Sequence, residues 1–350
     1  MPDGAAGVHI AIASVLTASR LGYESNMECP EAESGDALEV ASTEEHAPAH
    51  LGEAIEKLLK DEVFKNAIGA DMVAQFTAVK TVEWEKYLDA NSGLWNSYAG
   101  FDHPGLVETA KEQYKKFAGY HSLFGRLSEE TLELSEKLIE VSPFADGRVF
   151  LCNSGSEAND TAVKILWMLN ARKGNPRKRK IITRINGYHG VTLGASSMTG
   201  KPYNEVFQLP LDGFIHADCP HYWKFAKENE TEEEFTNRMA KNLEDLILKE
   251  DPDTIAGFVA EPVQGAGGVI PPSKGYFDLI QPILKKYKIP LIADEVICGF
   301  GRTGNLWGCQ TYNIKPDLII SSKCLTAGYF PMGAVIVNKE FADEFTSVSE

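Results

Sequence analysis

The sequence has no excess of basic residues, and this absence already narrows its function. Its 350 residues include 34 Lys and Arg against 50 Asp and Glu, a formal net charge of −16. Because an acidic surface repels nucleic acid and anionic membranes, we expect neither as a partner. The acidity is uneven, since residues 1–50 contain nine acidic residues and one arginine.

The sequence also lacks paired cysteines and long apolar runs. Six cysteines form no C-x-x-C pair and no metal-ligand spacing, so we expect reduced thiols, no disulfide and no metal. The apolar stretch 8–16 is too short to cross a bilayer and has no basic residues before it. No clear targeting signal is present, which leaves the cytoplasm and the mitochondrial matrix open.

A dinucleotide fingerprint is missing as well. No G-x-G-x-x-G opens a helix after an early strand, which disfavours a nicotinamide-dependent dehydrogenase. Residues 1–48 show no sustained periodicity and predict a disordered or irregular acidic leader. Apolar residues then recur at helical spacing from 51 to 63, and residues 82–103 are typical of short strands and turns.

The rest of the chain predicts an α/β fold with a mostly parallel sheet flanked by helices. We predict helices at 105–117, 128–141, 156–174, 231–250 and 275–287. We predict strands at 148–154, 179–185, 255–263, 289–297 and 317–322. In such folds, ligands bind at the carboxyl ends of the strands.

Small polar residues follow the first of these strands. Asn153, Ser154, Gly155 and Ser156 lead directly into a predicted helix. Backbone N–H groups and a hydroxyl there suit a phosphate, because the helix dipole favours negative charge. An ordinary N-cap by Ser154 or Ser156 is the alternative.

Aromatic and acidic residues end three other strands. Tyr188 and His189 offer an aromatic face for a flat heterocycle, although core packing explains a tyrosine equally well. Glu261 and Asp294 each end an apolar run, and a buried carboxylate must find a cation or several donors. Asp294 should point into the site and Glu295 away from it, and a structural ion pair is the alternative.

A single lysine, Lys323, lies between two apolar runs in "IISSKCLTAGYFPMGAV". A buried ammonium is costly unless it is paired or kept neutral. A lysine at a strand end, a phosphate cradle, an aromatic plate and a buried aspartate together meet the needs of pyridoxal 5′-phosphate. The four features therefore predict a site for this cofactor.

The motifs resemble those of the class III (ω-amino acid) aminotransferases, which are fold-type-I pyridoxal-phosphate enzymes. In chain order they are "NSGSEAND", "YHG", "EPVQGAGG", "IADEVICGFGRTG" and "SKCLTAGYFPMGAV". Further stretches, "DCPHYW", "ETEEEF" and "YNIKPDL", resemble the pyruvate-dependent 4-aminobutyrate transaminases and ω-transaminases.

The resemblance implies a role for each matching residue. Lys323 and Asp294 would be catalytic, as the Schiff-base lysine and the partner of the pyridine nitrogen. The other residues implied to bind the cofactor are Ser154, Gly155, Ser156, Tyr188, His189, Glu261, Gln264 and Val296, and those implied to bind the substrate are Leu94, Trp95 and Tyr120. No metal ligand is implied.

The implied reaction moves an amino group from an ω-amino acid or amine, such as 4-aminobutyrate or β-alanine, to a keto acid such as pyruvate. The implied assembly is a homodimer. An aminomutase, epimerase or decarboxylase on the same scaffold, or a non-catalytic truncated paralogue, stays open as an alternative.

The chain also departs from the family pattern. It stops soon after Lys323, so the C-terminal small subdomain is expected to be largely absent, and "VAQFTAVKTVEWEKYLDA" replaces the usual strands before "GLW". We therefore expect a leader at 1–48, a partial N-terminal segment at 49–100, a large cofactor-binding domain at 101–338, and the start of a truncated subdomain at 339–350.

Overall fold

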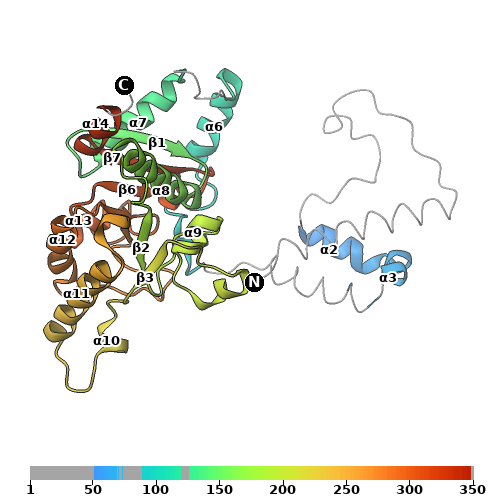
Figure 1. Ribbon diagram of the computed structural model, residues 1–350. Coiled ribbons are helices and arrows are strands. Elements are labelled where there is room, and N and C mark those ends of the chain that lie inside the picture. Colours follow the sequence, from blue (N-terminus) through green and yellow to red (C-terminus); the bar gives the residue numbers. More distant parts are fainter. Residues whose placement is uncertain (1–50, 69, 71–72, 74–88, 120–125, 348–350) are drawn as a thin grey trace. The chain divides into compact units, whose positions relative to one another are not determined.

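The computed structural model describes residues 51–68, 70, 73, 89–119 and 126–347, which belong to two compact units, Met1–Asp89 and Ala90–Glu350. In the first unit, α2 (Leu51–Lys60) and α3 (Glu62–Ile68) confirm the helical spacing expected there (Figure 1). The predicted leader at 1–48 lies outside the described residues. The domain boundaries inferred from sequence stay predictions.

The second unit is built on one seven-stranded sheet with the order β1-β7-β6-β5-β4-β2-β3. Its strands are β1 (Gly147–Cys152), β2 (Lys180–Arg184), β3 (Phe214–Ala217), β4 (Ile255–Ala260), β5 (Leu291–Asp294), β6 (Leu318–Ser321) and β7 (Gly333–Asn338). Strands β6, β5, β4, β2 and β3 are successive neighbours in the sheet and pair parallel, whereas β7 pairs antiparallel with both β6 and β1. The prediction of a mostly parallel sheet is confirmed.

Helices flank the sheet, as predicted (Figure 1). The longer ones are α6 (Pro104–Lys116), α7 (Glu129–Val141), α8 (Gly155–Arg172), α11 (Glu232–Lys249), α12 (Tyr276–Lys286) and α14 (Lys339–Ser347). The shorter ones are α5 (Ser92–Trp95), α9 (Leu193–Met198), α10 (Tyr222–Phe225), α13 (Gly308–Thr311) and the 3₁₀ turns η1 (Pro202–Phe207), η2 (Pro252–Thr254) and η3 (Lys323–Leu325). No helix in the described ranges is long and apolar enough to cross a bilayer.

Two apolar cores lie on opposite faces of the sheet. Consecutive residues of a strand contribute to different cores. Ile181 packs in the core that contains α8, and Ile182 packs in the core that contains α11 and α12. Strand β4 is buried along its whole length. Burial on both faces explains why these strands appear in the sequence as continuous apolar runs without alternation.

The predicted strands near the start of this unit are wrong for the part that the structure describes, residues 89–103. Turns and α5 occupy this stretch instead. Ser92, Gly93 and Trp95 have φ angles of 54°, 64° and 59°, which an extended strand does not allow. Strands β3 and β7 were not predicted from the sequence.

Candidate active site

The carboxyl ends of the strands bring the predicted residues to one edge of the sheet. Asp294 ends β5, Ser321 ends the adjacent β6, and Lys323 follows two residues later. Strand β1 runs parallel to β6, because each is antiparallel to β7, so the start of α8 lies at the same edge. Segments distant in sequence therefore meet at one place.

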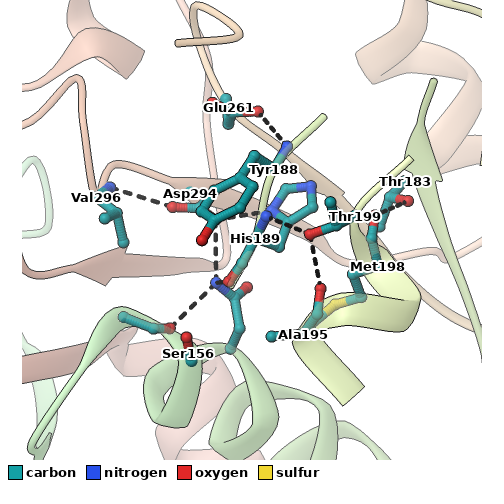
Figure 2. A network of polar contacts seen from close by, with 12 residues as sticks. Ser156, Thr183, Tyr188, His189, Ala195, Met198, Thr199, Glu261, Asp294 and Val296 are labelled. Atoms are coloured by element: carbon teal, nitrogen blue, oxygen red, sulfur yellow. Dashed lines mark hydrogen bonds and ion pairs between the residues drawn. The ribbon is translucent and has the colours of Figure 1, made fainter. Parts of the chain in front are cut away.

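Asp294 is the centre of a buried polar network (Figure 2). Its Oδ2 atom lies 2.7 Å from His189 Nδ1 and accepts a hydrogen bond from Asn159 Nδ2 at 3.0 Å. Its Oδ1 atom accepts from the backbone N–H of Val296 at 3.1 Å. Asp294 is only 2% exposed, and in the described part of the chain its one ion-pair partner is His189. The carboxylate is thus held in a fixed orientation.

Both side-chain partners of Asp294, His189 and Asn159, are held in place by hydrogen bonds to the backbone N–H and carbonyl of His189. The N–H of His189 donates to Thr199 Oγ1 at 2.9 Å, and Asn159 Nδ2 also donates to the carbonyl of His189 at 2.9 Å. Asn159 was missed in the sequence analysis. The available signal was an amide one turn after Gly155 on an otherwise buried face of α8.

The structure confirms the N-cap interpretation of the Asn153–Ser156 stretch for Ser154, and the phosphate interpretation stays a prediction. Ser154 is an ordinary N-cap, because its hydroxyl accepts from the N–H of Glu157 at 3.1 Å. Ser156 is not the cap, and its hydroxyl accepts from the N–H of Val191 at 3.0 Å. Gly155 lies against Val296, where a Cβ would come within 2.9 Å of Cγ2. The capping serine and the residues suited to a phosphate are therefore neighbours.

Glu261 is buried and bound by two backbone donors. Tyr188 N–H donates to Oε1 at 3.0 Å, and Gly265 N–H donates to Oε2 at 2.9 Å. Burial raises the pKa of Glu261, and these two donors oppose the rise. The backbone carbonyl of Glu261 accepts a hydrogen bond from Arg184. The side chain thereby fixes the loop that carries Tyr188.

Gln264 is 1% exposed and has contacts at both ends of its amide. Its Nε2 donates to the carbonyl of Ile185 at 2.9 Å, and its Oε1 accepts from Cys219 Sγ at 3.2 Å. In this arrangement Gln264 links the segment after β2 to the segment after β4. Its implied role in binding the cofactor stays a prediction.

Lys323 lies in η3 with a positive φ of 44°. Its Nζ donates to the carbonyl of Leu94 at 3.1 Å and lies 5.8 Å from the centre of the Trp95 ring. Burial lowers the pKa of Lys323, while the negative charge of Asp294 acts to raise it. Lys323 therefore contacts the predicted substrate-binding stretch. Tyr120 lies outside the described residues.

Arg302 and Cys324 also hold this stretch and were not assigned a role from sequence. Arg302 donates from Nη2 to the carbonyl of Trp95 at 2.9 Å and from Nε to the carbonyl of Ile297 at 3.0 Å. Cys324 Sγ donates to the same Trp95 carbonyl at 3.3 Å. The available signal was the arginine in "GFGRTG", which follows the Asp294 strand closely in sequence.

Residues 72–350 match the model of the aminotransferase class-III family, which is most of the chain. The chain belongs to the class III aminotransferases. Its fold is accordingly that of the fold-type-I pyridoxal-phosphate transferases.

Named relatives agree with this class III assignment. The chain is 48% identical over 302 residues to gamma aminobutyrate transaminase 3, chloroplastic, from Solanum lycopersicum, which covers 80% of this chain and 58% of the relative. It resembles the structure of an omega-aminotransferase from Paracoccus denitrificans, with 66% identity and a TM-score of 0.75 over 76% of this chain and 60% of that one. It also resembles the structure of a PMP-bound aminotransferase from Vibrio fluvialis, with 65% identity and a TM-score of 0.75 over 76% of this chain and 59% of that one. The chain thus spans about three fifths of the relatives' length.

A second family model, the glutamine synthetase catalytic domain, matches residues 1–95. This match overlaps the class III match at residues 72–95 and includes the whole of the first unit, Met1–Asp89. The unusual run before "GLW" falls within it. The departure of this run from the class III pattern is therefore accompanied by a similarity to a second family.

Class III aminotransferases depend on pyridoxal 5′-phosphate, and the residues present fit that group. Asp294 is buried, and its partners are N–H donors and a histidine. Its carboxylate can also accept a hydrogen bond from a protonated ring nitrogen. Gly155, which leaves no room for a Cβ against Val296, opens α8, and the first backbone N–H groups of this helix suit a phosphate. Lys323 would supply the amine.

Proposed function

We propose that this chain carries the machinery for transamination of an ω-amino acid or amine, such as 4-aminobutyrate or β-alanine, with a keto acid such as pyruvate as acceptor. The observation that carries the proposal is the placement of a buried aspartate, Asp294, at the carboxyl end of β5 and of Lys323 just after the carboxyl end of the adjacent β6. The similarity to named ω-aminotransferases and gamma-aminobutyrate transaminases supports the substrate class.

Lys323 would act through its Nζ atom. A primary amine takes a proton from carbon only when it is uncharged, and burial favours that state by lowering the pKa of Lys323. The Leu94 carbonyl, which accepts from Nζ, keeps this amine at the side of the site formed by Leu94 and Trp95. The same atom can then return the proton at a neighbouring carbon.

Asp294 would hold a proton on the cofactor's ring nitrogen. When bound, pyridoxal phosphate supplies an electron sink that stabilises negative charge on the substrate carbon. That capacity depends on a cationic ring, which a buried carboxylate stabilises. His189 and Asn159 position Asp294 for this role, because both bind its Oδ2 atom.

We also propose that the chain forms a homodimer next to this site. Large apolar side chains between residues 191 and 211 are exposed, namely Val191 (76%), Leu193 (68%), Tyr203 (56%), Val206 (77%), Phe207 (67%) and Leu211 (46%). A set of this kind marks an interaction surface. It begins at Val191, whose N–H binds Ser156 at the start of α8.

A mitochondrial or chloroplastic location is stated in the names of several relatives and is proposed here on that basis.

The test combines covalent trapping with an assay. The chain is incubated with pyridoxal phosphate, reduced with borohydride and digested, and the modified peptide is identified by mass spectrometry. We expect the label on Lys323, and Lys323→Ala should lose both the label and alanine production from an amine and pyruvate. Lys164→Ala, which removes an exposed lysine of α8, is the matched control. Label that persists equally in Lys323→Ala would contradict the proposal.

A further inference from the structure

A second cavity lies at the opposite edge of the sheet, at the amino ends of the parallel strands. It has a volume of about 1020 Å³, and Leu291, the first residue of β5, and Asp317, just before β6, are among its lining residues. Phe341 and Glu344 of α14 also line it, because β7 runs antiparallel and ends at this edge. The cavity shares no lining residue with the site around Lys323.

Five lysines line this cavity, and we call the part of the cavity that they line the basic groove. Two come from the segment after α8, two from the end of α12 and the turn after it, and one from the loop before β6, namely Lys173, Lys178, Lys285, Lys288 and Lys315. Such a concentration of ammonium groups is unusual in a chain with a net charge of −16. Like charges at close range cost free energy unless an anion compensates for them.

Three carboxylates, Asp278, Asp317 and Glu344, also line the cavity, so its lysines outnumber its carboxylates by two. Glu344 pairs with Lys173. Asp317 is directed to the backbone, where its Oδ2 accepts from Leu291 N–H at 2.8 Å, and Asp278 accepts from Asn313 at 3.3 Å. Within the described ranges, Lys173 is the one lysine of the basic groove that forms an ion pair with a carboxylate.

Lys178 lies close to two other lysines of the basic groove. Its Nζ donates to the backbone carbonyl of Lys288 at 2.9 Å. Burial is the main cause that lowers the pKa of Lys178, the negative charge of Asp253 opposes it, and the positive charges of Lys173 and Lys288 add smaller contributions that lower it. An anion bound among these groups would relieve the repulsion.

We propose that the basic groove binds the phosphate chain of an organic polyphosphate such as a nucleoside triphosphate. A single phosphate would contact few of five ammonium groups that come from three separate segments, whereas a chain of phosphates can contact several. The cavity is also large enough for an attached organic group, since small-molecule sites occupy roughly 300–1,000 Å³. Pro282 and Pro290 give that group an apolar surface.

The test is calorimetric titration of the holoenzyme, with its cofactor bound, using ATP, tripolyphosphate and adenosine without divalent cations. Cofactor loading keeps the phosphate cradle at α8 occupied. We expect ATP and tripolyphosphate to bind with a Kd below about 1 mM and adenosine not to bind. Raising the salt concentration should weaken binding, because exposed ammonium groups are screened.

Variants decide whether the basic groove is the site. Lys285→Glu combined with Lys315→Glu should raise the Kd for tripolyphosphate at least about tenfold, since charge-assisted contacts are replaced by repulsion. Lys115→Glu combined with Lys164→Glu changes the net charge equally, on exposed positions outside the cavity, and should change the Kd by less than about twofold. Equal losses in both double variants, no binding at millimolar ATP, or adenosine binding as tightly as ATP would each overturn the proposal.

Discussion

Asp294 and Glu295 are adjacent carboxylates with separate functions. Asp294 faces the site, where it contacts His189, Asn159 and the N–H of Val296. Glu295 instead accepts from Gly308 N–H at 2.9 Å and Cys309 N–H at 2.6 Å, at the start of α13. The alternation expected at a strand end therefore holds between these two residues. Glu295 serves to anchor the loop that follows the strand.

Burial raises the pKa of Glu295 from 4.5 to about 7, against the two backbone donors. The folded state therefore binds this proton more tightly than the unfolded state, so the residue's contribution to stability falls as pH rises from about 4.5 to 7 and is constant above. The shift corresponds to about 3 kcal/mol.

The corresponding prediction concerns Glu295→Gln. The free energy of unfolding is measured by urea titration between pH 5 and 8. Over this range the value for the unaltered chain should fall by up to about 3 kcal/mol more than the value for Glu295→Gln. Glu140→Gln, an exposed carboxylate of α7, is the control and should leave the decline unchanged. Parallel pH profiles for Glu295→Gln and the unaltered chain would refute the elevated pKa.

At the scale of elements, the first turn of α8 is set by its contact with the loop after β5. Gly155 leaves no room for a Cβ, because Val296 Cγ2 would lie at 2.9 Å and Ser322 Cβ at 3.4 Å. The helix start, the Asp294 loop and the Lys323 loop therefore pack as one unit. Moving α8 by a few tenths of an ångström would alter all three.

We predict that Gly155→Ala weakens pyridoxal-phosphate binding at least about tenfold and lowers stability by roughly 1–3 kcal/mol, the usual cost of overpacking. Fluorescence titration with the cofactor and urea unfolding measure the two effects. Gly119→Ala, where a Cβ meets nothing within 4 Å, should be close to neutral. Adding Val296→Ala to Gly155→Ala should recover part of the lost stability, and strict additivity of the two changes would argue against the contact.

Much of this arrangement could be predicted from sequence, because the polar residues interrupt apolar runs at strand ends. Asp294 and Lys323 were identifiable in this way. Asn159 and Arg302 were not, because they contact groups far away in sequence, the Asp294 side chain for Asn159 and the Trp95 carbonyl for Arg302. The stretch 89–103 was misassigned because positive φ angles at Ser92 and Trp95 carry no clear sequence signal. Antiparallel pairing of β7 likewise follows from topology, which periodicity does not specify.

At the scale of the whole chain, two similarities meet near residue 90. The unit Met1–Asp89 lies within the match to the glutamine synthetase catalytic domain, and Ala90–Glu350 contains the residues proposed for transamination. Every contact described for the site lies within the second unit. The exposed apolar side chains between 191 and 211 belong to that unit too, so the proposed dimer requires nothing from the first.

The exposed side chains of Val206 and Phe207 lie next to each other in sequence at the end of η1. Burying Val206 and Phe207 against a second copy would stabilise a dimer, since full burial of such side chains contributes about 1.5–3 kcal/mol each. Val206→Glu combined with Phe207→Glu should therefore shift the species seen by sedimentation velocity at micromolar concentration from dimer to monomer. Val63→Glu in α3, at a residue 66% exposed, is the control and should leave the dimer intact. A double variant that sediments as a dimer would show that this surface is not the interface, and a monomeric unaltered chain would show that these residues do not assemble alone.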